Sequence, residues 1–392
     1  MEESTIFERA LSIELPPKQS AFLWGARKTG KTTYLRRRFP EARTYDLLQT
    51  DLYLDLAKSP ARLRQELAYA DAVEDDDLVI IDEVQRIPRL LDEVHWLIEN
   101  SGWRFILCGS SARKLKRGQA NMLGGRAWRY QMHPLSAHEM PGFDLLQALN
   151  RGLVPSHYLS SDHERSLQAY LQDYLAEEIK AEALVRNLPA FASFLDALGY
   201  SHGQLTNYAN VARDCGVDAK TVKEYYQILE DTLLGSFIWP FAKQARRQIV
   251  RATPKFYLFD VGVAAYLARR RYRELRGAEA GQAFEHFVLM ELLAYRDYCN
   301  PRMEIQYWRT KSGIEVDFVL DSGRVAIETK ISDRPGGRDL RGLRAFIEEH
   351  RPEAAFVACT AARPFRIEGE DCPIDVLPWQ AFLERLWAGQ LV

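Results

Sequence analysis

The chain has 392 residues, of which 27% are charged, and a formal net charge of −2, values typical of a folded protein with two or three domains. It is not a bulk polycation, so any contact with nucleic acid has to come from local basic patches. The five cysteines show no C-x-x-C spacing, which argues against a zinc site and a disulfide framework. The first residues lack signal-peptide features and no apolar run is long enough to span a membrane, so we expect a cytoplasmic protein.

The segment GARKTGKT at residues 25–32 matches the phosphate-binding pattern G-x-x-x-x-G-K-[ST]. An apolar strand over 21–25 and a helix over 32–39 are predicted on its two sides, and a helix N-terminus favours phosphate. Lys31 would reach the β and γ oxygens, and the Thr32 hydroxyl can ligate Mg²⁺. The residues expected to contact the nucleotide are Gly25, Ala26, Arg27, Lys28, Thr29, Gly30, Lys31, Thr32 and Thr33.

A second segment has four apolar residues at 78–81 that run into Asp82 and Glu83. A continuous apolar run predicts a buried parallel strand, and the carboxyl end of such a strand is where an α/β sheet places its ligands. We expect Asp82 to support Mg²⁺ and Glu83 to polarise the attacking water, because phosphoryl transfer needs mainly positioning and charge neutralisation. Together the two segments predict a protein that binds ATP and Mg²⁺.

The next predicted strand, over residues 105–108, ends in Gly109, Ser110 and Ser111. This strand end would lie beside that of the Asp82 strand, so Ser110 or Ser111 can touch the γ-phosphate or the attacking water. Gly-Ser-Ser is also good turn chemistry, and a simple strand-to-loop turn is the alternative.

A final strand of this domain is predicted over residues 127–132, directly after Arg126. An arginine here can complete the ATP site of a neighbouring subunit, because an arginine finger stabilises transition-state charge. We therefore expect a homo-oligomer with Arg126 at the subunit interface. A solvated surface arginine is the alternative.

The middle of the chain is predicted to be helical over 165–179 and 189–203, followed by a helix-turn-helix pattern over 208–215 and 220–231. Asp218 can cap the second of these two helices, and an apolar segment after it resembles the strand of a wing. Such a winged-helix-like fold serves DNA reading and protein contact alike.

Basic residues gather directly after this pattern, in a chain that is slightly acidic. Such a cluster can bind the phosphates of DNA, or it can be a solvated surface balanced by acids elsewhere. There are two such clusters: one is Lys243, Arg246, Arg247 and Arg251, and the other is Arg269, Arg270, Arg271, Arg273 and Arg276.

The last third carries a second set of charged residues on predicted strands. A strand over 304–310 is followed by two alternating strands within 313–332. Asp317 lies on the first of these two, and Glu328 and Lys330 lie on the second. A carboxylate from each strand would hold Mg²⁺ while the lysine orients or activates a water for phosphodiester cleavage. An exposed hairpin face with alternating charges is the alternative.

The segments GARKTGKT, LVIIDEVQR, ILCGSSARKL and GGRAWRYQMHPLSAHEM, in this order, resemble the prokaryotic AAA+ ATPases with an uncharacterised C-terminal domain. That domain is similar to the PD-(D/E)xK nucleases through YWRTKSGIEVDFVL and VAIETK. The resemblance implies an α/β chain with a P-loop NTPase AAA+ core on a parallel sheet (residues 1–150), a helical, winged-helix-like middle segment (151–250) and an α/β restriction-endonuclease-like domain (251–392).

The resemblance also implies roles for individual residues. Lys31 and Thr32 would contact phosphate and Mg²⁺, and Asp82 and Glu83 would be metal support and catalytic base. The sensor would be Ser110 or Ser111, and Arg126 would be the intersubunit or sensor arginine. A C-terminal metal site would consist of Glu285, Asp317, Glu328 and Lys330.

These observations predict an ATP-hydrolysing protein that acts on DNA, with branched or broken DNA among the candidate substrates. The motif does not decide whether the nuclease-like site cleaves DNA. The alternative is a nucleotide-dependent switch for protein contacts, with a catalytically inactive C-terminal binding domain. In a third interpretation, hydrolysis is vestigial and the nuclease is the working part.

Overall fold

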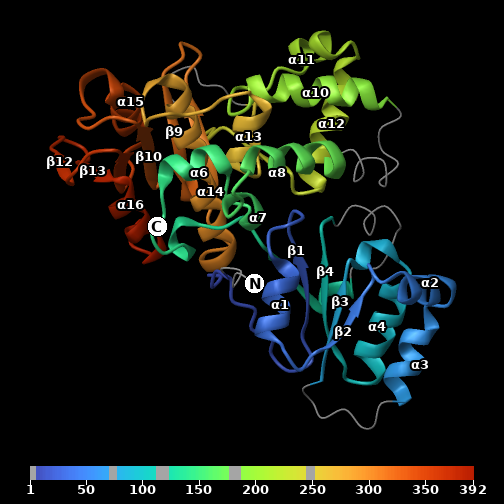
Figure 1. Cartoon of the computed structure of the whole chain (residues 1–392). Coiled ribbons are helices and arrows are strands. Elements are labelled where there is room, and N and C mark those ends of the chain that lie inside the picture. Colours follow the sequence, from blue (N-terminus) through green and yellow to red (C-terminus); the bar gives the residue numbers. More distant parts are fainter. Residues whose placement is uncertain (1–5, 70–76, 112–122, 176–186, 244–251) are drawn as a thin grey trace. The chain divides into compact units, whose positions relative to one another are not determined.

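The computed structural model describes residues 6–69, 77–111, 123–175, 187–243 and 252–392 (Figure 1). The chain forms two compact units. The N-terminal unit takes residues 9–134 together with the short segment Asp231–Leu234. The C-terminal unit takes residues 135–230 and 235–392 together with the first residues of the chain, up to Glu8. The two predicted C-terminal domains therefore lie in one unit, and the three-domain division of the chain stays a prediction.

The N-terminal unit is built on a five-stranded sheet in the order β2-β3-β4-β1-β5, in which every neighbouring pair is parallel. The register pairs Trp24 with Gly109 and Asp46 with Asp82, so the carboxyl ends of the strands meet at one edge. The strands are β1 (Ser20–Trp24), β2 (Arg43–Asp46), β3 (Leu78–Asp82), β4 (Arg104–Gly109) and β5 (Ala127–Gln131).

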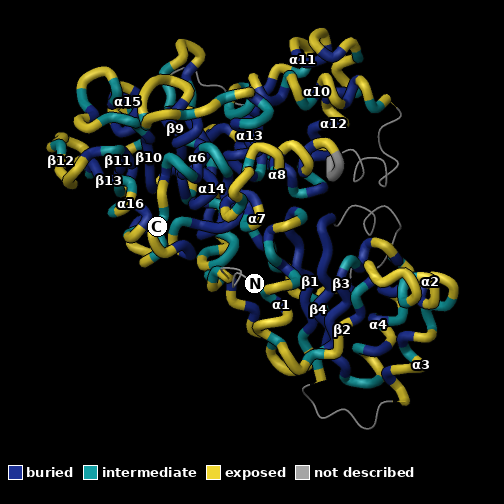
Figure 2. Tube along the Cα trace, in the orientation of Figure 1, coloured by how far each residue is buried: buried dark blue, intermediate teal, exposed yellow. Residues whose placement is uncertain are grey.

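Helices cover this sheet because alternate strand residues point to opposite faces. Phe22, Val79 and Phe105 share one core with apolar residues of three helices, which gather on one side of the strands in Figure 1. These helices are α2 (Thr50–Lys58), α3 (Ala61–Tyr69) and α4 (Leu90–Asn100). Helix α1 (Lys31–Arg38) follows β1 after a short loop, and strands β1 and β4 are buried throughout (Figure 2).

The predicted strands at 21–25, 78–81, 105–108 and 127–132 and the predicted helix at 32–39 are confirmed to within one or two residues. Strand β2 and helices α2 and α3 have no counterpart among the predictions. Their short segments carry mixed polarity, and β2 is an edge strand with two exposed residues, so its pattern is weak.

The C-terminal unit begins with a helical part. The predicted helix-turn-helix is confirmed as α11 (Tyr208–Cys215) and α12 (Ala219–Asp231), and Asp218 accepts a hydrogen bond from the Thr221 N–H at 2.8 Å. Strands β6 (Gly235–Ile238) and β7 (Lys255–Leu258) follow as an antiparallel pair. The other helices are α6 (Leu145–Arg151), α7 (Pro155–Tyr158), α8 (His163–Ala169), α10 (Leu188–Ser201) and α13 (Val261–Leu267).

Two of the predictions for this part are only partly covered. The helix predicted over 165–179 is α8 followed by a π-helical turn at Tyr170–Leu175, and its last residues lie outside the described part of the chain. Arg246, Arg247 and Arg251 of the basic cluster also lie outside it. The order of three helices and a two-stranded sheet fits a winged helix, and that assignment stays a prediction.

The rest of the unit is a six-stranded mixed sheet in the order β12-β13-β11-β10-β9-β8. Helices α14 (Gly277–Cys299) and α16 (Trp379–Trp387) share a core with one set of strand residues, and α15 (Arg341–His350) shares a core with another. The strands are β8 (Ile305–Arg309), β9 (Glu315–Leu320), β10 (Val325–Lys330), β11 (Ala354–Cys359), β12 (Phe365–Ile367) and β13 (Ile374–Pro378). The strands predicted at 304–310 and within 313–332 are confirmed.

Candidate nucleotide site and C-terminal carboxylate cluster

The loop between β1 and α1 has the backbone of a phosphate cradle. Gly30 has φ 97° and Lys28 has φ 64°, left-handed values that turn the chain into the helix. The Lys31 ammonium donates hydrogen bonds to the carbonyl oxygens of Gly25 at 2.7 Å and Ala26 at 3.0 Å, and the side chain is 6% exposed. A buried, loop-bound lysine is thus held where the β and γ phosphates of a nucleotide would meet it.

Two contacts that the motif does not contain hold this loop in place. A Cβ on Gly25 would lie 2.5 Å from the Met132 carbonyl oxygen, so only glycine fits there. The Arg9 guanidinium donates to the carbonyl oxygen of Thr29 at 2.6 Å and to that of His133 at 2.7 Å. Arg9 therefore ties the loop to the segment after β5, a role with no signal in the local sequence.

Thr32 and Asp82 come together as predicted for two supports of one metal ion. The Thr32 hydroxyl donates to Asp82 Oδ2 at 2.6 Å, and Asp82 Oδ1 accepts the Glu83 N–H at 3.0 Å. Asp82 is only 4% exposed. A hydroxyl and a carboxylate are oxygen ligands that suit Mg²⁺, so these donors fit the ion that a nucleotide brings.

Glu83 is held in a defined position by a residue that the sequence reasoning missed. Its backbone is left-handed, with φ 58°, which costs energy in a residue other than glycine and occurs mainly at functional sites. The Gln85 amide Nε2 donates to Glu83 Oε2 at 2.6 Å and to Ser110 Oγ at 3.1 Å. A Cβ on Gly109 would lie 2.2 Å from Gln85 Oε1, so glycine makes room for this amide. The predicted base and the predicted sensor therefore share one donor.

Ser111 contacts the segment that returns to this unit from the helical region. Its hydroxyl donates to the Asp231 carbonyl oxygen at 3.3 Å. In the same segment Thr232 is 1% exposed, and Leu233 packs against the core of the N-terminal unit. Ser110 and Ser111 thus have different surroundings, and Ser110 is the one linked to Glu83 through Gln85.

Arg126 lies away from the phosphate loop of its own subunit. Because β5 runs parallel to β1 and Ala127 pairs with Ser20, Arg126 is at the edge of the sheet where the strands begin. It forms an ion pair with Glu99, and its side chain is 39% exposed. An arginine at this edge can act on ATP only in another subunit, and that role stays a prediction.

In the C-terminal unit, Glu328 and Lys330 of β10 are hydrogen-bonded to each other, and Asp317 of β9 is hydrogen-bonded to Thr329 of β10. The Lys330 ammonium donates to Glu328 Oε1 at 2.6 Å. Asp317 Oδ2 accepts the N–H of Thr329 at 2.8 Å and its hydroxyl at 2.7 Å. Burial, followed by the charge of Asp317, raises the pKa of Glu328 well above its usual range. The Glu328 oxygen Oε2 is buried and has no hydrogen-bond partner within the described residues.

Glu285 is bound differently from the other carboxylates. Its Oε1 accepts a hydrogen bond from Lys255 Nζ at 3.1 Å and another from the Tyr257 hydroxyl. Lys255 also pairs with Glu315. Burial raises the pKa of Glu285, and Lys255 opposes that rise. Burial by itself would lower the pKa of Lys255, but Glu285 and its neighbours raise it well above the usual value, so the lysine is charged.

Within the described ranges, no group of three or more His, Cys, Asp or Glu side chains is arranged to hold a metal ion. The charge of Asp317 contributes to the rise in the pKa of Glu328, and the unpartnered Glu328 oxygen suits a cation. Glu285, the other predicted metal ligand, instead accepts a hydrogen bond from Lys255. A metal site of Glu285, Asp317 and Glu328 stays a prediction.

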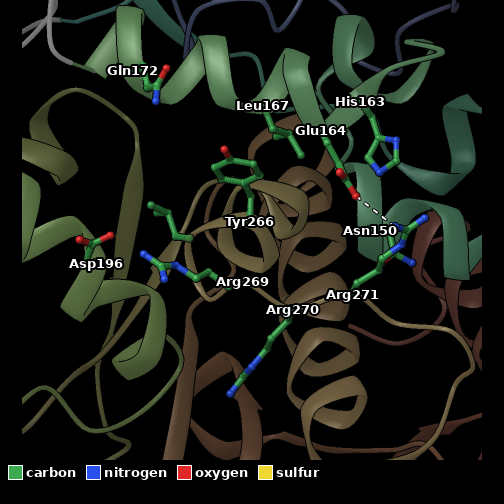
Figure 3. A pocket seen from close by; sticks show the side chains of 11 residues that line it. Asn150, His163, Glu164, Leu167, Gln172, Asp196, Tyr266, Arg269, Arg270 and Arg271 are labelled. Carbon is green, nitrogen blue, oxygen red and sulfur yellow. Dashed lines mark ion pairs between the residues drawn. The ribbon is translucent and has the colours of Figure 1, made fainter.

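A pocket of about 500 Å³ lies beside the arginines that follow α13 (Figure 3). Figure 3 shows Arg271 directed at Glu164, an ion pair of 3.4 Å, and Arg270 pairs with Glu279 at 3.3 Å. Arg269 has no ion pair within the described part of the chain and has a left-handed φ of 53°. The pocket is lined by Asn150, His163, Glu164, Leu167, Gln172, Asp196, Tyr266, Leu267, Arg269, Arg270 and Arg271.

Acidic neighbours thus pair with Arg270 and Arg271 of these basic residues. In the residues that the structure describes, none of the helices has the length and apolar character needed to cross a membrane.

Three family models match segments of the chain. Residues 17–141 match the model of the family described as "AAA domain". Residues 142–274 match "Domain of unknown function (DUF8612)", and residues 280–382 match "Domain of unknown function (DUF4143)". The uncharacterized protein Rv2008c of Mycobacterium tuberculosis is 30% identical over 336 residues, which are 81% of this chain and 69% of that protein. The chain belongs to its family.

The same values hold for another member of this family, the uncharacterized protein Mb2031c of Mycobacterium bovis. Among solved structures, the ORC1 protein of Aeropyrum pernix in complex with DNA is 13% identical, with 65% of this chain and 87% of that chain covered and a TM-score of 0.26. A signal transduction ATPase with numerous domains (STAND) protein from Pyrococcus horikoshii is 14% identical, with 71% and 44% covered and a TM-score of 0.20. TM-scores this low carry no argument.

The N-terminal unit is therefore a P-loop ATPase domain of the AAA type, as the motifs predicted. The family that matches residues 280–382 is described as a domain of unknown function, so this match assigns no activity. The similarity of this part to nucleases stays a prediction.

Proposed function

We propose that this protein hydrolyses ATP and uses the cycle to act on DNA through its C-terminal unit. The observation that carries the ATPase half is the pair of hydrogen-bonded links around the phosphate loop, Thr32 to Asp82 and Glu83 through Gln85 to Ser110. These links support the proposal that Asp82 is the metal support and Glu83 the base of the site.

In this mechanism Lys31 leaves the loop carbonyls for the β and γ phosphates and neutralises their charge. Glu83 accepts hydrogen-bond donation from the attacking water and orients it, while Gln85 fixes the carboxylate. Mg²⁺, when bound, would neutralise charge on the phosphate oxygens. Thr32 and Asp82 are the residues that would hold it.

The DNA half is supported by the helix-turn-helix pattern with its two-stranded sheet and by Arg269 and Arg273, which have no ion pair within the described residues. The Glu328–Lys330 pair beside Asp317 adds the chemistry of phosphodiester cleavage. ATP turnover by the full chain, measured without DNA and with single-stranded, duplex and four-way-junction DNA, tests the proposal. Stimulation by one DNA form supports it; identical turnover in all four conditions contradicts the DNA half.

A second candidate function is a nucleotide-dependent switch for protein contacts, with a C-terminal unit that does not cut. The Lys255–Glu285 pair favours it, because a lysine holds one predicted metal ligand. The ion pairs of Arg270 and Arg271 favour it as well. A salt-dependent affinity for DNA distinguishes the DNA function from the switch function. Contacts with DNA phosphates release counterions, so the affinity falls as the salt concentration rises, whereas a protein switch should show no such affinity.

A further inference from the structure

Arg9 lies outside the phosphate-binding motif, and its guanidinium is hydrogen-bonded to the loop that the motif forms. We propose that Arg9 is a positioning residue for ATP, which orients one peptide of this loop so that its N–H faces the phosphates. The inference rests on the proposed ATPase function and names a residue that sets the affinity for the diphosphate part of the nucleotide.

The peptide that Arg9 orients joins Thr29 to Gly30 and is trans, like every peptide bond of the described residues. Arg9 Nη1 donates a hydrogen bond to the Thr29 carbonyl oxygen at 2.6 Å. In a trans peptide the carbonyl oxygen and the following N–H point in opposite directions, so the Gly30 N–H points away from Arg9. A phosphate loop binds its anion through such N–H groups, and a reversed peptide would present a carbonyl oxygen instead. The direction of this peptide therefore decides whether it attracts or repels phosphate.

The backbone of the loop does not fix this direction by itself. Gly30 has φ 97°, and glycine adopts positive and negative φ about equally readily, so the peptide before it can turn over at little cost. The Thr29 side chain is held independently, because its hydroxyl donates to the Ala26 carbonyl oxygen at 2.8 Å and is buried. A hydrogen bond from outside the loop selects the orientation of the peptide, and Arg9 supplies it.

Arg9 is itself anchored to the sheet that carries the loop. Its Nη2 donates to the carbonyl oxygens of His133 at 2.7 Å and Pro134 at 3.2 Å. These two residues follow β5, and the Met132 N–H donates to the Trp24 carbonyl oxygen at 2.7 Å, which ties the segment to the end of β1. A guanidinium presents its donors in a rigid planar fork. The loop carbonyl is therefore held at a fixed position relative to the sheet.

The test measures ADP binding to the full chain by calorimetry, with Arg9→Ala and the control Arg37→Ala, an exposed arginine on the helix that follows the loop. Arg9→Ala should bind ADP about ten-fold more weakly than the wild type, which corresponds to the loss of one hydrogen bond to a charged group. Arg37→Ala should match the wild type. Equal ADP affinity of folded Arg9→Ala and wild type would overturn the proposal.

Chemical rescue distinguishes positioning of the loop from general support of the fold. Guanidinium ion, at a concentration too low to unfold the protein, should restore part of the ADP affinity of Arg9→Ala, because it can donate to the carbonyl oxygens of Thr29 and His133. The same concentration of sodium ion should restore none of it, and guanidinium should not raise the affinity of the wild type. A folded Arg9→Ala that guanidinium does not rescue would show that Arg9 only supports the fold, and would overturn the proposal.

Should Arg9→Ala fail to fold, Arg9→Lys carries the test. It keeps the positive charge but loses the planar fork that joins two carbonyl groups, so it should bind ADP about three-fold more weakly than the wild type. Wild-type ADP affinity in Arg9→Lys would overturn the proposal. A wild type that does not bind ADP contradicts the proposed function itself, whereas a wild type that binds ADP no better than the Arg9 variants contradicts only this inference.

Discussion

Thr32 and Asp82 lie 50 positions apart in the chain and are joined by a hydrogen bond of 2.6 Å from Thr32 Oγ1 to Asp82 Oδ2. Thr32 lies in the first turn of helix α1, and Asp82 is the last residue of the buried strand β3. The contact forms because β4 lies between β1 and β3, so both strand ends meet at one edge of the sheet. It links the two motifs of the ATPase domain in one site.

Lys31→Ala and Glu83→Gln should impair ATP hydrolysis in different ways. Lys31→Ala removes the charge that meets the β and γ phosphates, so both ATP affinity and turnover should fall. Glu83→Gln keeps the shape of the loop, so ATP should still bind while hydrolysis stalls. Calorimetric ATP binding and phosphate release measure the two effects. Wild-type turnover in Glu83→Gln would refute the role of Glu83.

Gln85→Ala should lower turnover by about ten- to hundred-fold with ATP affinity nearly unchanged, because an orienting partner of a catalytic group is lost. The variant removes the donor that joins Glu83 Oε2 at 2.6 Å to Ser110 Oγ at 3.1 Å. Ser111→Ala is the matched control, since Ser111 contacts the Asp231 carbonyl instead. Equal turnover of Gln85→Ala and wild type would contradict the link.

Lys31→Ala and Arg126→Ala subunits, each inactive alone, should regain part of the ATPase activity when mixed. Arg126 lies at the opposite strand edge from its own phosphate loop, so a mixed oligomer can combine an intact loop with an intact arginine. Turnover of mixtures and light scattering measure this. A monomer that hydrolyses ATP at full rate would rule out the intersubunit role.

Asp317→Asn and Glu328→Gln should abolish any metal-dependent cleavage of DNA while DNA binding persists. Each removes an anionic ligand of the predicted metal and leaves the basic residues in place. Gel assays on labelled duplex and junction DNA with Mg²⁺ or Mn²⁺ give both readouts. If the wild type neither retards nor cuts DNA at low salt, the switch function takes the place of the DNA function.

Arg269→Ala should weaken DNA binding, because an arginine without an ion pair is free to contact phosphate. The slope of log DNA affinity against log salt concentration should become smaller by about one. Arg270→Ala is the matched control, since Arg270 already pairs with Glu279 at 3.3 Å. Its effect on the slope should be smaller. Equal slopes in both variants and the wild type would show that these arginines do not contact DNA.

Glu291 should make stability depend on pH. Burial raises its pKa to about 7, with Glu139 adding to the rise, while the Ala137 N–H and the Trp387 indole N–H lower it. A carboxyl whose pKa is higher folded than unfolded (about 4.3) stabilises fully below the unfolded value and loses that contribution as the pH rises through 7. The free energy of unfolding should therefore fall as the pH rises.

Urea unfolding of the wild type and Glu291→Gln at about pH 5.5 and about pH 8 isolates this group, because all other titrating residues are common to both proteins. The wild type should lose about 2 kcal/mol relative to the variant over this interval. An unchanged difference between the two proteins would mean that Glu291 is ionised throughout.

The sequence by itself determined the ATPase half in some detail. The glycine-rich segment that ends in Lys31 and Thr32 predicted the strand, loop and helix around it. The apolar run that ends in Asp82 predicted the buried strand. Both predictions succeed because the signals are local. The bounds of α11 matched the prediction residue for residue for the same reason, since Asn207 caps its start and Gly216 ends it.

Only the tertiary structure decided which side chains these residues meet. Gln85 lies in the LVIIDEVQR segment but had no predicted role there, and Arg9 and Lys255 lie outside the predicted motifs. Their partners come from distant segments that the sheets bring together. The bond between Lys255 and Glu285 depends on burial, which makes a charged pair necessary, and on the packing of β7 against α14, which no local pattern encodes. The strands and loops can therefore be predicted from the sequence. The ion-pair partners cannot, because they are selected when folding removes charged groups from water.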